Sequence, residues 1–174
     1  NFFESSEDSE KYLDKNGDSN NVLFLPAFNG LGAPYWDSDV RGGFYGITQD
    51  SSINDMVTAC FNSIAFQTRE ITMILEKYDI EVSSLLVDGG MVHNNTFCEI
   101  LANSLQKQIL RPQNVESTAV GACIVAMMAS GEDLNKIQVS EIDCFKPNAD
   151  NMKRNENHFK EWKSYLLRSI RSKQ

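Results

Sequence analysis

The sequence is poor in features that would assign it to several common classes of protein. Its four cysteines, at positions 60, 98, 123 and 144, include no Cys-x-x-Cys pair, which argues against a zinc cluster. They are also too sparse for the disulfide framework of a small secreted domain, so we expect reduced thiols in the core. The chain has no run of about 18 apolar residues and no signal-type start. We therefore expect no membrane span and a soluble, cytoplasmic protein.

Positive charge is also scarce. The chain has 16 lysines and arginines against 24 aspartates and glutamates, which gives a net charge of −8 at pH 7. Because nucleic-acid binding depends on basic surface, no nucleic-acid partner is expected. The exception is the basic segment 151–174, in which Phe159, Trp162, Leu166 and Ile170 recur at helical spacing. We interpret it as a C-terminal helix with a docking stripe and a solvated basic face; the alternative is a nucleic-acid or membrane patch.

What the sequence does contain is a regular alternation of helical and strand patterns. Helices are expected over about 6–15, 53–78, 94–106 and 117–130, and strands over 22–25, 42–48, 84–88 and 108–111. Ser52 or Asn54 would cap the long helix. Strands that alternate with helices predict an α/β fold with a parallel or mixed sheet flanked by helices.

Two stretches have unusual composition. The loop 26–40 carries Phe28, Leu31, Tyr35 and Trp36, which favour burial, so we expect it to wrap a core or line a cleft. Its two glycines, at 30 and 32, lack the third glycine of a dinucleotide fingerprint. The segment 117–130 is rich in alanine and contains Gly121, which predicts a helix in close packing. The alternative is that Gly121 ends a shorter helix.

The most informative stretch is the turn that follows the apolar residues 84–87. Gly89 and Gly90 remove the side chains that would keep a ligand from the backbone, and a helix is expected to start directly afterwards. Asn94 adds an amide that can donate and accept hydrogen bonds. These residues predict a nucleotide-binding turn; the alternative is a plain connection between a strand and a helix.

Taken together, these segments resemble the C-terminal domain of the FGGY-type carbohydrate kinases, in the branch that phosphorylates glycerol. The resemblance rests on the loop 26–37, Arg41-Gly42, the segment 63–69, the turn 87–90 with Asn94-Asn95, and the segment 118–122. It implies an actin-like, ribonuclease-H-like fold. The Gly-Leu-Gly-Ala-Pro form of the loop favours glycerol over xylulose, ribulose or gluconate, whose kinases are the alternative. A non-enzymatic actin-like module that binds ATP is a third hypothesis.

The resemblance also implies how this chain is organised and what it binds. Residues 1–20 would be a remnant helix and linker, 21–150 the C-terminal nucleotide-binding domain, and 151–174 a C-terminal helix. ATP with Mg²⁺ would be the cofactor, held through Gly90, Asn94, Gly89 and Asp88. No metal ligand set and no catalytic residue is expected in this chain, because an N-terminal domain of the same protein would supply the catalytic aspartate and the glycerol site. A homo-oligomer is an open option.

Three charged or titratable residues receive structural rather than functional interpretations. His93 lies beside the proposed turn, but we expect it to be an ordinary polar residue, and we assign no role to His158. Arg69 is expected to be a structural ion-pair partner across the sheet and not a phosphate clamp.

Overall fold

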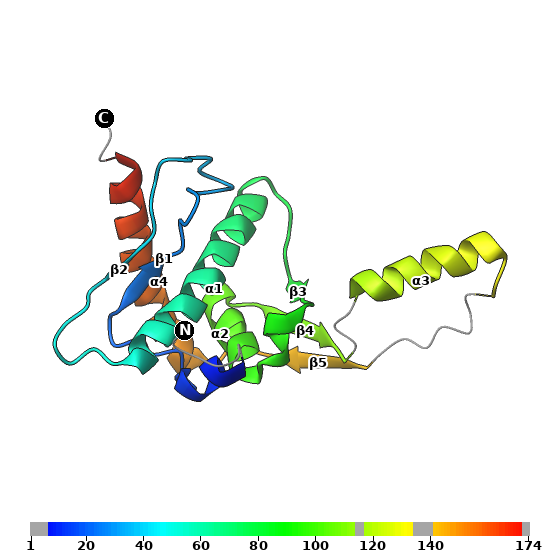
Figure 1. Ribbon diagram of the computed structural model, residues 1–174, viewed down its shortest axis with the longest axis horizontal. Coiled ribbons are helices and arrows are strands. Elements are labelled where there is room, and N and C mark those ends of the chain that lie inside the picture. The colour runs from blue at the N-terminus through cyan, green and yellow to red at the C-terminus, as the bar shows by residue number, and fades with distance from the viewer. Residues whose placement is uncertain (1–6, 114–116, 134–140, 172–174) are drawn as a thin grey trace.

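The structure is a computed structural model that describes residues 7–113, 117–133 and 141–171 (Figure 1). Its elements are the 3-10 helix η1 (Glu7–Tyr12), strands β1 (Leu23–Leu25) and β2 (Gly43–Tyr45), helix α1 (Ile53–Lys77), strand β3 (Ser84–Leu86), the 3-10 helix η2 (Gly90–His93), helix α2 (Asn95–Leu105), strand β4 (Gln108–Pro112), helix α3 (Ser117–Ser130), strand β5 (Ile142–Phe145) and helix α4 (Ala149–Arg171). This alternation confirms the expected α/β class.

The strands form two small sheets. In the three-stranded sheet, β3 pairs with β4 in parallel and β4 pairs with β5 antiparallel, so the sheet is mixed, as expected. The sequence-based assignment missed β5, which lies at one edge of the sheet, with β3 at the other. In the second sheet β1 and β2 run antiparallel, with Leu23 opposite Tyr45. The three-stranded sheet is the one that positions the turn after β3.

Helix α1 is the central helix of the packing, because it contacts α2, α4 and β1 (Figure 1). It begins after Ser52, whose side chain accepts a hydrogen bond from the Asp55 amide while the Asp55 carboxylate accepts one from the Ser52 amide. This reciprocal pattern is a capping box, and it decides between the two expected caps in favour of Ser52.

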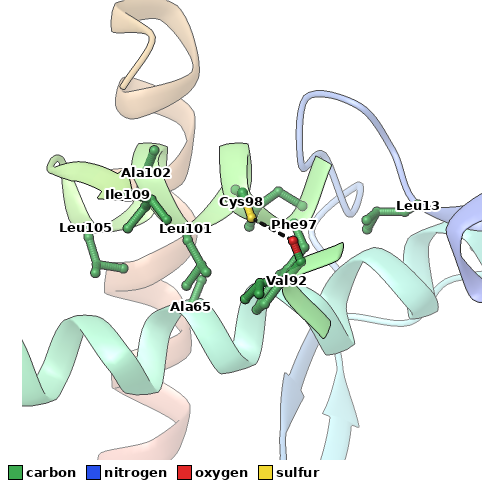
Figure 2. Packing of buried hydrophobic residues seen from close by; sticks show 10 residues of the cluster. Leu13, Ala65, Val92, Phe97, Cys98, Leu101, Ala102, Leu105 and Ile109 are labelled. Atoms are coloured by element: carbon green, nitrogen blue, oxygen red, sulfur yellow. Dashed lines mark hydrogen bonds between the residues drawn. The ribbon is translucent and has the colours of Figure 1, made fainter. Parts of the chain in front are cut away.

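Two clusters of buried side chains hold the helices on the sheets. Figure 2 shows the first, in which α2 residues pack against α1 and β4; its buried members are Leu13, Ala65, Val92, Phe97, Cys98, Ile100, Leu101, Ala102, Leu105 and Ile109. The second joins β1 and the loop 26–40 to α1 and α4. In that cluster Phe159, Trp162 and Leu166 are buried and Ile170 packs against them, which confirms the docking stripe expected for the C-terminal helix.

The side chains of the loop 26–40 are buried only in part, although all four of its large apolar residues were expected to be buried. Leu31 is buried in the second cluster and Tyr35 packs against it. Phe28 and Trp36, however, are 75% and 79% exposed, so the expected burial is wrong for these two side chains. Backbone hydrogen bonds within the loop hold it in place: the Leu31 amide donates to the Asp37 carbonyl, and the Asp37 amide donates to the Leu31 carbonyl. These bonds fix the path of the loop without burying every aromatic ring.

Two further expectations about burial need correction. Cys98 is buried and Cys60 is partly buried, but Cys123 and Cys144 are exposed, so only half of the thiols belong to the core; all four are free. Helix α3 runs unbroken to Ser130, so Gly121 does not end it. Yet α3 has no buried residue, and Figure 1 shows it apart from the other elements. Its expected close packing is therefore absent within the described ranges.

No helix in the described part of the chain is long and apolar enough to cross a bilayer.

Candidate functional site

The turn after β3 is held by the neighbouring strand on one side. The Val87 amide donates to the Leu110 carbonyl at 2.9 Å, which extends the contact between β3 and β4 by one residue. The chain then passes through Asp88 to Gly89, whose φ of 93° lies in the region that favours glycine. Gly89 precedes the single turn of η2, and its carbonyl accepts a hydrogen bond from the Val92 amide at 3.2 Å.

The two glycines of this turn form a bare surface. A Cβ atom added at either Gly89 or Gly90 would meet no heavy atom within 4 Å. Their backbones differ, however, because only Gly89 has a positive φ. A side chain at Gly90 would therefore meet neither backbone strain nor a protein neighbour. The space next to the Gly90 Cα is therefore open.

Asn94 links the turn to helix α2. It is the N-cap residue of α2, and its Oδ1 accepts a hydrogen bond from the Phe97 amide at 3.0 Å. The residue is only 7% exposed. The oxygen is an acceptor only, so the NH₂ group is the part of this side chain that can donate to a ligand. The cap also holds the side chain on α2, beside the depression described next and not in its lining.

An open depression of about 350 Å³ adjoins the turn. Its lining comes from α1, β3, the turn with η2, and α2, and comprises Ile64, Thr68, Leu85, Val87, Asp88, Gly89, Gly90, Met91, Val92, Phe97 and Leu101. Figure 2 shows that Val92, Phe97 and Leu101 come from the first buried cluster. A largely apolar wall with a few polar groups is the composition expected of a small-molecule site.

The remaining predicted residues of the turn lie at the surface. Asp88 is exposed, and so is His93, in agreement with its interpretation as a polar surface residue. Among the residues with described positions, no group of three His, Cys, Asp or Glu side chains is placed to hold a metal ion. Asp88 therefore contributes a single carboxylate at the edge of the turn.

Sequence analysis missed one residue of this site, Arg111. Its guanidinium donates from Nη1 to the carbonyls of Val92 at 2.7 Å and His93 at 3.2 Å, the last two residues of η2. The same group pairs with Asp143 on β5. The available signal was a charged residue that directly follows the apolar pair Ile109-Leu110 in the strand 108–112. Its partner was hidden because β5 itself was not predicted.

The loop 26–40 does not form a second ligand site of useful size. The cavity between it and α1 and α4 is about 20 Å³, which is room for about one water molecule. Beside it the Tyr35 hydroxyl donates to the Glu70 carboxylate, which also pairs with Lys163 at 2.7 Å. Burial, followed by the hydrogen bond to Glu70, raises the pKa of Tyr35, so the phenol stays protonated. This part of the loop wraps the core.

Arg69 has the structural role that was expected of it, although its partner lies on a helix. Its Nη2 pairs with Glu156 on α4 at 2.5 Å, and its guanidinium stacks over the Phe159 ring at 4.2 Å. This contact joins α1 to α4, not two strands of a sheet.

Comparisons with known proteins agree with this geometry. Residues 3–130 match the FGGY family of carbohydrate kinases, C-terminal domain. The glycerol kinase of Alkaliphilus metalliredigens is 38% identical over 173 residues, which is 95% of this chain and 34% of that protein. The glycerol kinase of Haemophilus influenzae is 39% identical over 168 residues, or 94% of this chain and 33% of that protein.

Solved structures show the same similarity. The crystal structure of Plasmodium falciparum glycerol kinase with ADP matches with a TM-score of 0.79 and 27% identity over 97% of this chain and 34% of that one. A xyloylose kinase from Brucella ovis matches with a TM-score of 0.78 over 94% of this chain and 35% of that one. Its 21% identity shows the fold alone. The expected actin-like fold and the resemblance to these kinases are thus confirmed. The chain spans about a third of the length of the curated relatives it matches.

Proposed function

This chain belongs to the FGGY family of carbohydrate kinases, and we propose that it forms the adenosine-binding, C-terminal part of a glycerol kinase. Such an enzyme transfers the γ-phosphate of ATP to glycerol and yields glycerol 3-phosphate. One observation carries the proposal: the bare turn at Gly89 and Gly90 ends a strand beside an apolar depression and precedes a capped helix. The choice of glycerol as the acceptor is supported by the curated relatives, which are named glycerol kinase.

Each residue of the turn has a distinct part in holding the nucleotide. Gly90 lets the adenosine approach the backbone, because a side chain there would occupy the open space. Asn94 donates a hydrogen bond from its NH₂ group, while its oxygen keeps the side chain in place on α2. Gly89 permits the positive φ of the turn. Asp88 orients the turn or reaches the nucleotide through metal-bound water.

Mg²⁺ fits this arrangement through the nucleotide. Proteins bind Mg²⁺ through one or two carboxylates together with substrate phosphates, and the exposed Asp88 offers one such carboxylate. When bound, the ion neutralises charge on the phosphates during transfer. This chain's own contribution is to grip and orient the adenosine end, and positioning is most of what a protein supplies in phosphoryl transfer.

The rest of the reaction belongs to a longer protein that contains this chain. An N-terminal domain of the same protein would provide the aspartate that accepts the proton from a glycerol hydroxyl, and the residues that bind glycerol. The isolated 174 residues should then show no kinase activity. Closure of the two domains would align the γ-phosphate with the hydroxyl.

Acceptor preference of the longer protein tests the proposed function. We expect phosphorylation of glycerol and little turnover of xylulose, ribulose or gluconate; the reverse preference would assign the chain to another sugar kinase. ATP turnover without any acceptor, coupled to binding of a partner protein, would identify a switch module instead. Glycerol phosphorylation by the isolated chain would contradict the proposal that the catalytic and glycerol-binding residues belong to an N-terminal domain.

Substitution of Gly90 tests the proposed site. Gly90→Val should raise the KM for ATP severalfold and leave the KM for glycerol unchanged, because the new side chain would occupy the space assigned to the nucleotide, while its Cβ has no protein atom within 4 Å. Gly32→Val is the matched control, since Gly32 is also exposed, lacks a positive φ and has no heavy atom within 4 Å of an added Cβ. Unchanged ATP kinetics in Gly90→Val would refute the site.

A further inference from the structure

Arg111 connects the turn to the far edge of the sheet. It lies on β4 directly opposite Asp143 of β5, and its Nε and Nη2 donate to Asp143 Oδ2 at 3.2 and 2.6 Å. Its Nη1 donates to the carbonyls of Val92 and His93. The side chain is only 13% exposed, and its guanidinium stands 5.0 Å over the Phe145 ring. One largely buried cation thus joins β5, β4 and η2.

The carbonyls that Arg111 binds are groups that η2 cannot satisfy itself. A helix leaves its last carbonyls without partners, and a helix of four residues has few internal hydrogen bonds. The Val92 carbonyl also accepts a weak hydrogen bond from the Cys98 thiol at 3.4 Å. Both lone pairs of that oxygen are therefore occupied, and the stronger donor is the charged one.

This arrangement fixes one end of η2 and leaves the other free for a ligand. Gly90 opens η2, and Asn94 follows it directly as the cap of α2. The two residues assigned to the nucleotide therefore flank the carbonyls that Arg111 holds. A shift of these carbonyls would move the Gly90 backbone relative to the Asn94 amide.

We propose that the Arg111–Asp143 ion pair is a positioning device for the nucleotide-binding turn, so that affinity for adenosine nucleotides depends on it. This inference rests on the proposed function of Gly90 and Asn94. Arg111 acts through the backbone of η2. Asp143, whose side chain is about half exposed, orients the largely buried guanidinium and balances its charge.

The test uses the longer protein that contains this chain, with ADP as the probe. Arg111→Lys keeps the charge but loses the planar fork that reaches both partners, and Asp143→Asn keeps the shape but loses the charge. Each should raise the ADP dissociation constant about tenfold, the effect of one lost charge-assisted hydrogen bond. The KM for glycerol should stay unchanged. Amide exchange at Val92 and Asn94, whose N–H groups donate to the carbonyls of Gly89 and Met91, should become faster.

Arg69→Lys is a closely matched control. Arg69 is also a largely buried arginine, 12% exposed, that pairs with a carboxylate and stacks over a phenylalanine ring, but it joins α1 to α4. The Arg69→Lys substitution should lower the free energy of unfolding without changing the affinity for ADP. The inference is overturned if Arg111→Lys lowers stability while ADP affinity is preserved, or if Arg69→Lys weakens ADP binding equally.

Gly90→Val separates this inference from the proposed function. If Gly90→Val weakens ADP binding and Arg111→Lys does not, the site stands and only the positioning role fails. If Gly90→Val leaves ADP binding unchanged, the site itself is wrong, and the role of Arg111 falls with it.

Discussion

The indole N–H of Trp162 donates a 2.8 Å hydrogen bond to the main-chain carbonyl of Phe24, across 138 residues of sequence. This contact attaches α4 to strand β1. Around it Trp162 packs against the rings of Phe66 and Phe159, with centroid distances of 5.8 and 6.2 Å. The C-terminal helix is thereby an integral part of the second cluster, although its sequence is strongly charged.

We expect Trp162→Phe to destabilise the protein by about 1–3 kcal/mol, because the Phe24 carbonyl loses its buried donor. Trp162→Ala should cost about 3–5 kcal/mol through the added cavity. The two variants can be compared by urea unfolding followed by circular dichroism. Trp36 is the control, since it is the other tryptophan and is 79% exposed. A cost for Trp36→Phe equal to that of Trp162→Phe would contradict the assigned role of the hydrogen bond.

His158 predicts a pH dependence of stability. Burial lowers its pKa from the ordinary 6.5, an effect opposed by Asp18 and Glu161 and assisted by Arg154. Its Nδ1 is buried and has no hydrogen-bond partner. The folded state therefore disfavours the protonated imidazole, while the unfolded chain takes up the proton below the ordinary pKa. The contribution is favourable above pH 6.5 and is lost as the pH falls below that value towards the lowered folded pKa.

The free energy of unfolding, measured by urea titration from about one unit above the ordinary pKa to about 1.5 units below it, should fall at the acid end. His158→Gln should remove that part of the slope. The exposed His93 is the matched control, and His93→Gln should keep the wild-type slope. An unchanged slope in His158→Gln would assign the pH dependence to other groups.

Gly30 and Gly32 form a natural pair for testing how the loop 26–40 is held. Gly30 has a φ of 91°, and a Cβ there would lie 2.5 Å from the Asp37 carbonyl oxygen, whereas a Cβ at Gly32 would meet nothing within 4 Å. Gly30→Ala should cost at least about 1–3 kcal/mol, the range for strained backbone positions. Gly32→Ala should change stability by less than about 0.5 kcal/mol. Thermal unfolding measures both, and equal costs would show that the loop adapts to a side chain.

Local pattern was sufficient for the long elements. Apolar spacing predicted a helix over 53–78, and the structure has it at Ile53–Lys77; the helix over 117–130 has the predicted bounds. The Asp-Gly-Gly sequence likewise predicted an open turn, because the absence of side chains is a property of the residues themselves. Whether that turn binds a nucleotide stays a prediction.

Short strands, and the exposure of individual side chains, were harder to predict from the sequence. Strand β5 has four residues, and its edge position leaves its pattern only partly buried, so no clear periodicity marks it. Trp36 and Cys123 are residue types that are usually buried, but exposure depends on what the rest of the chain places beside them.

The sequence by itself therefore determined the long helices and the open turn, because periodicity and glycine placement are properties of neighbouring residues. It also contained the motifs on which the resemblance to a kinase family rests. Only the tertiary structure decided that Arg111 would meet η2 and Asp143, and that Trp162 would reach Phe24. These contacts join residues that lie 19, 32 and 138 positions apart. They exist because the packing of helices on strands brings distant polar groups together away from water, where each must find a partner.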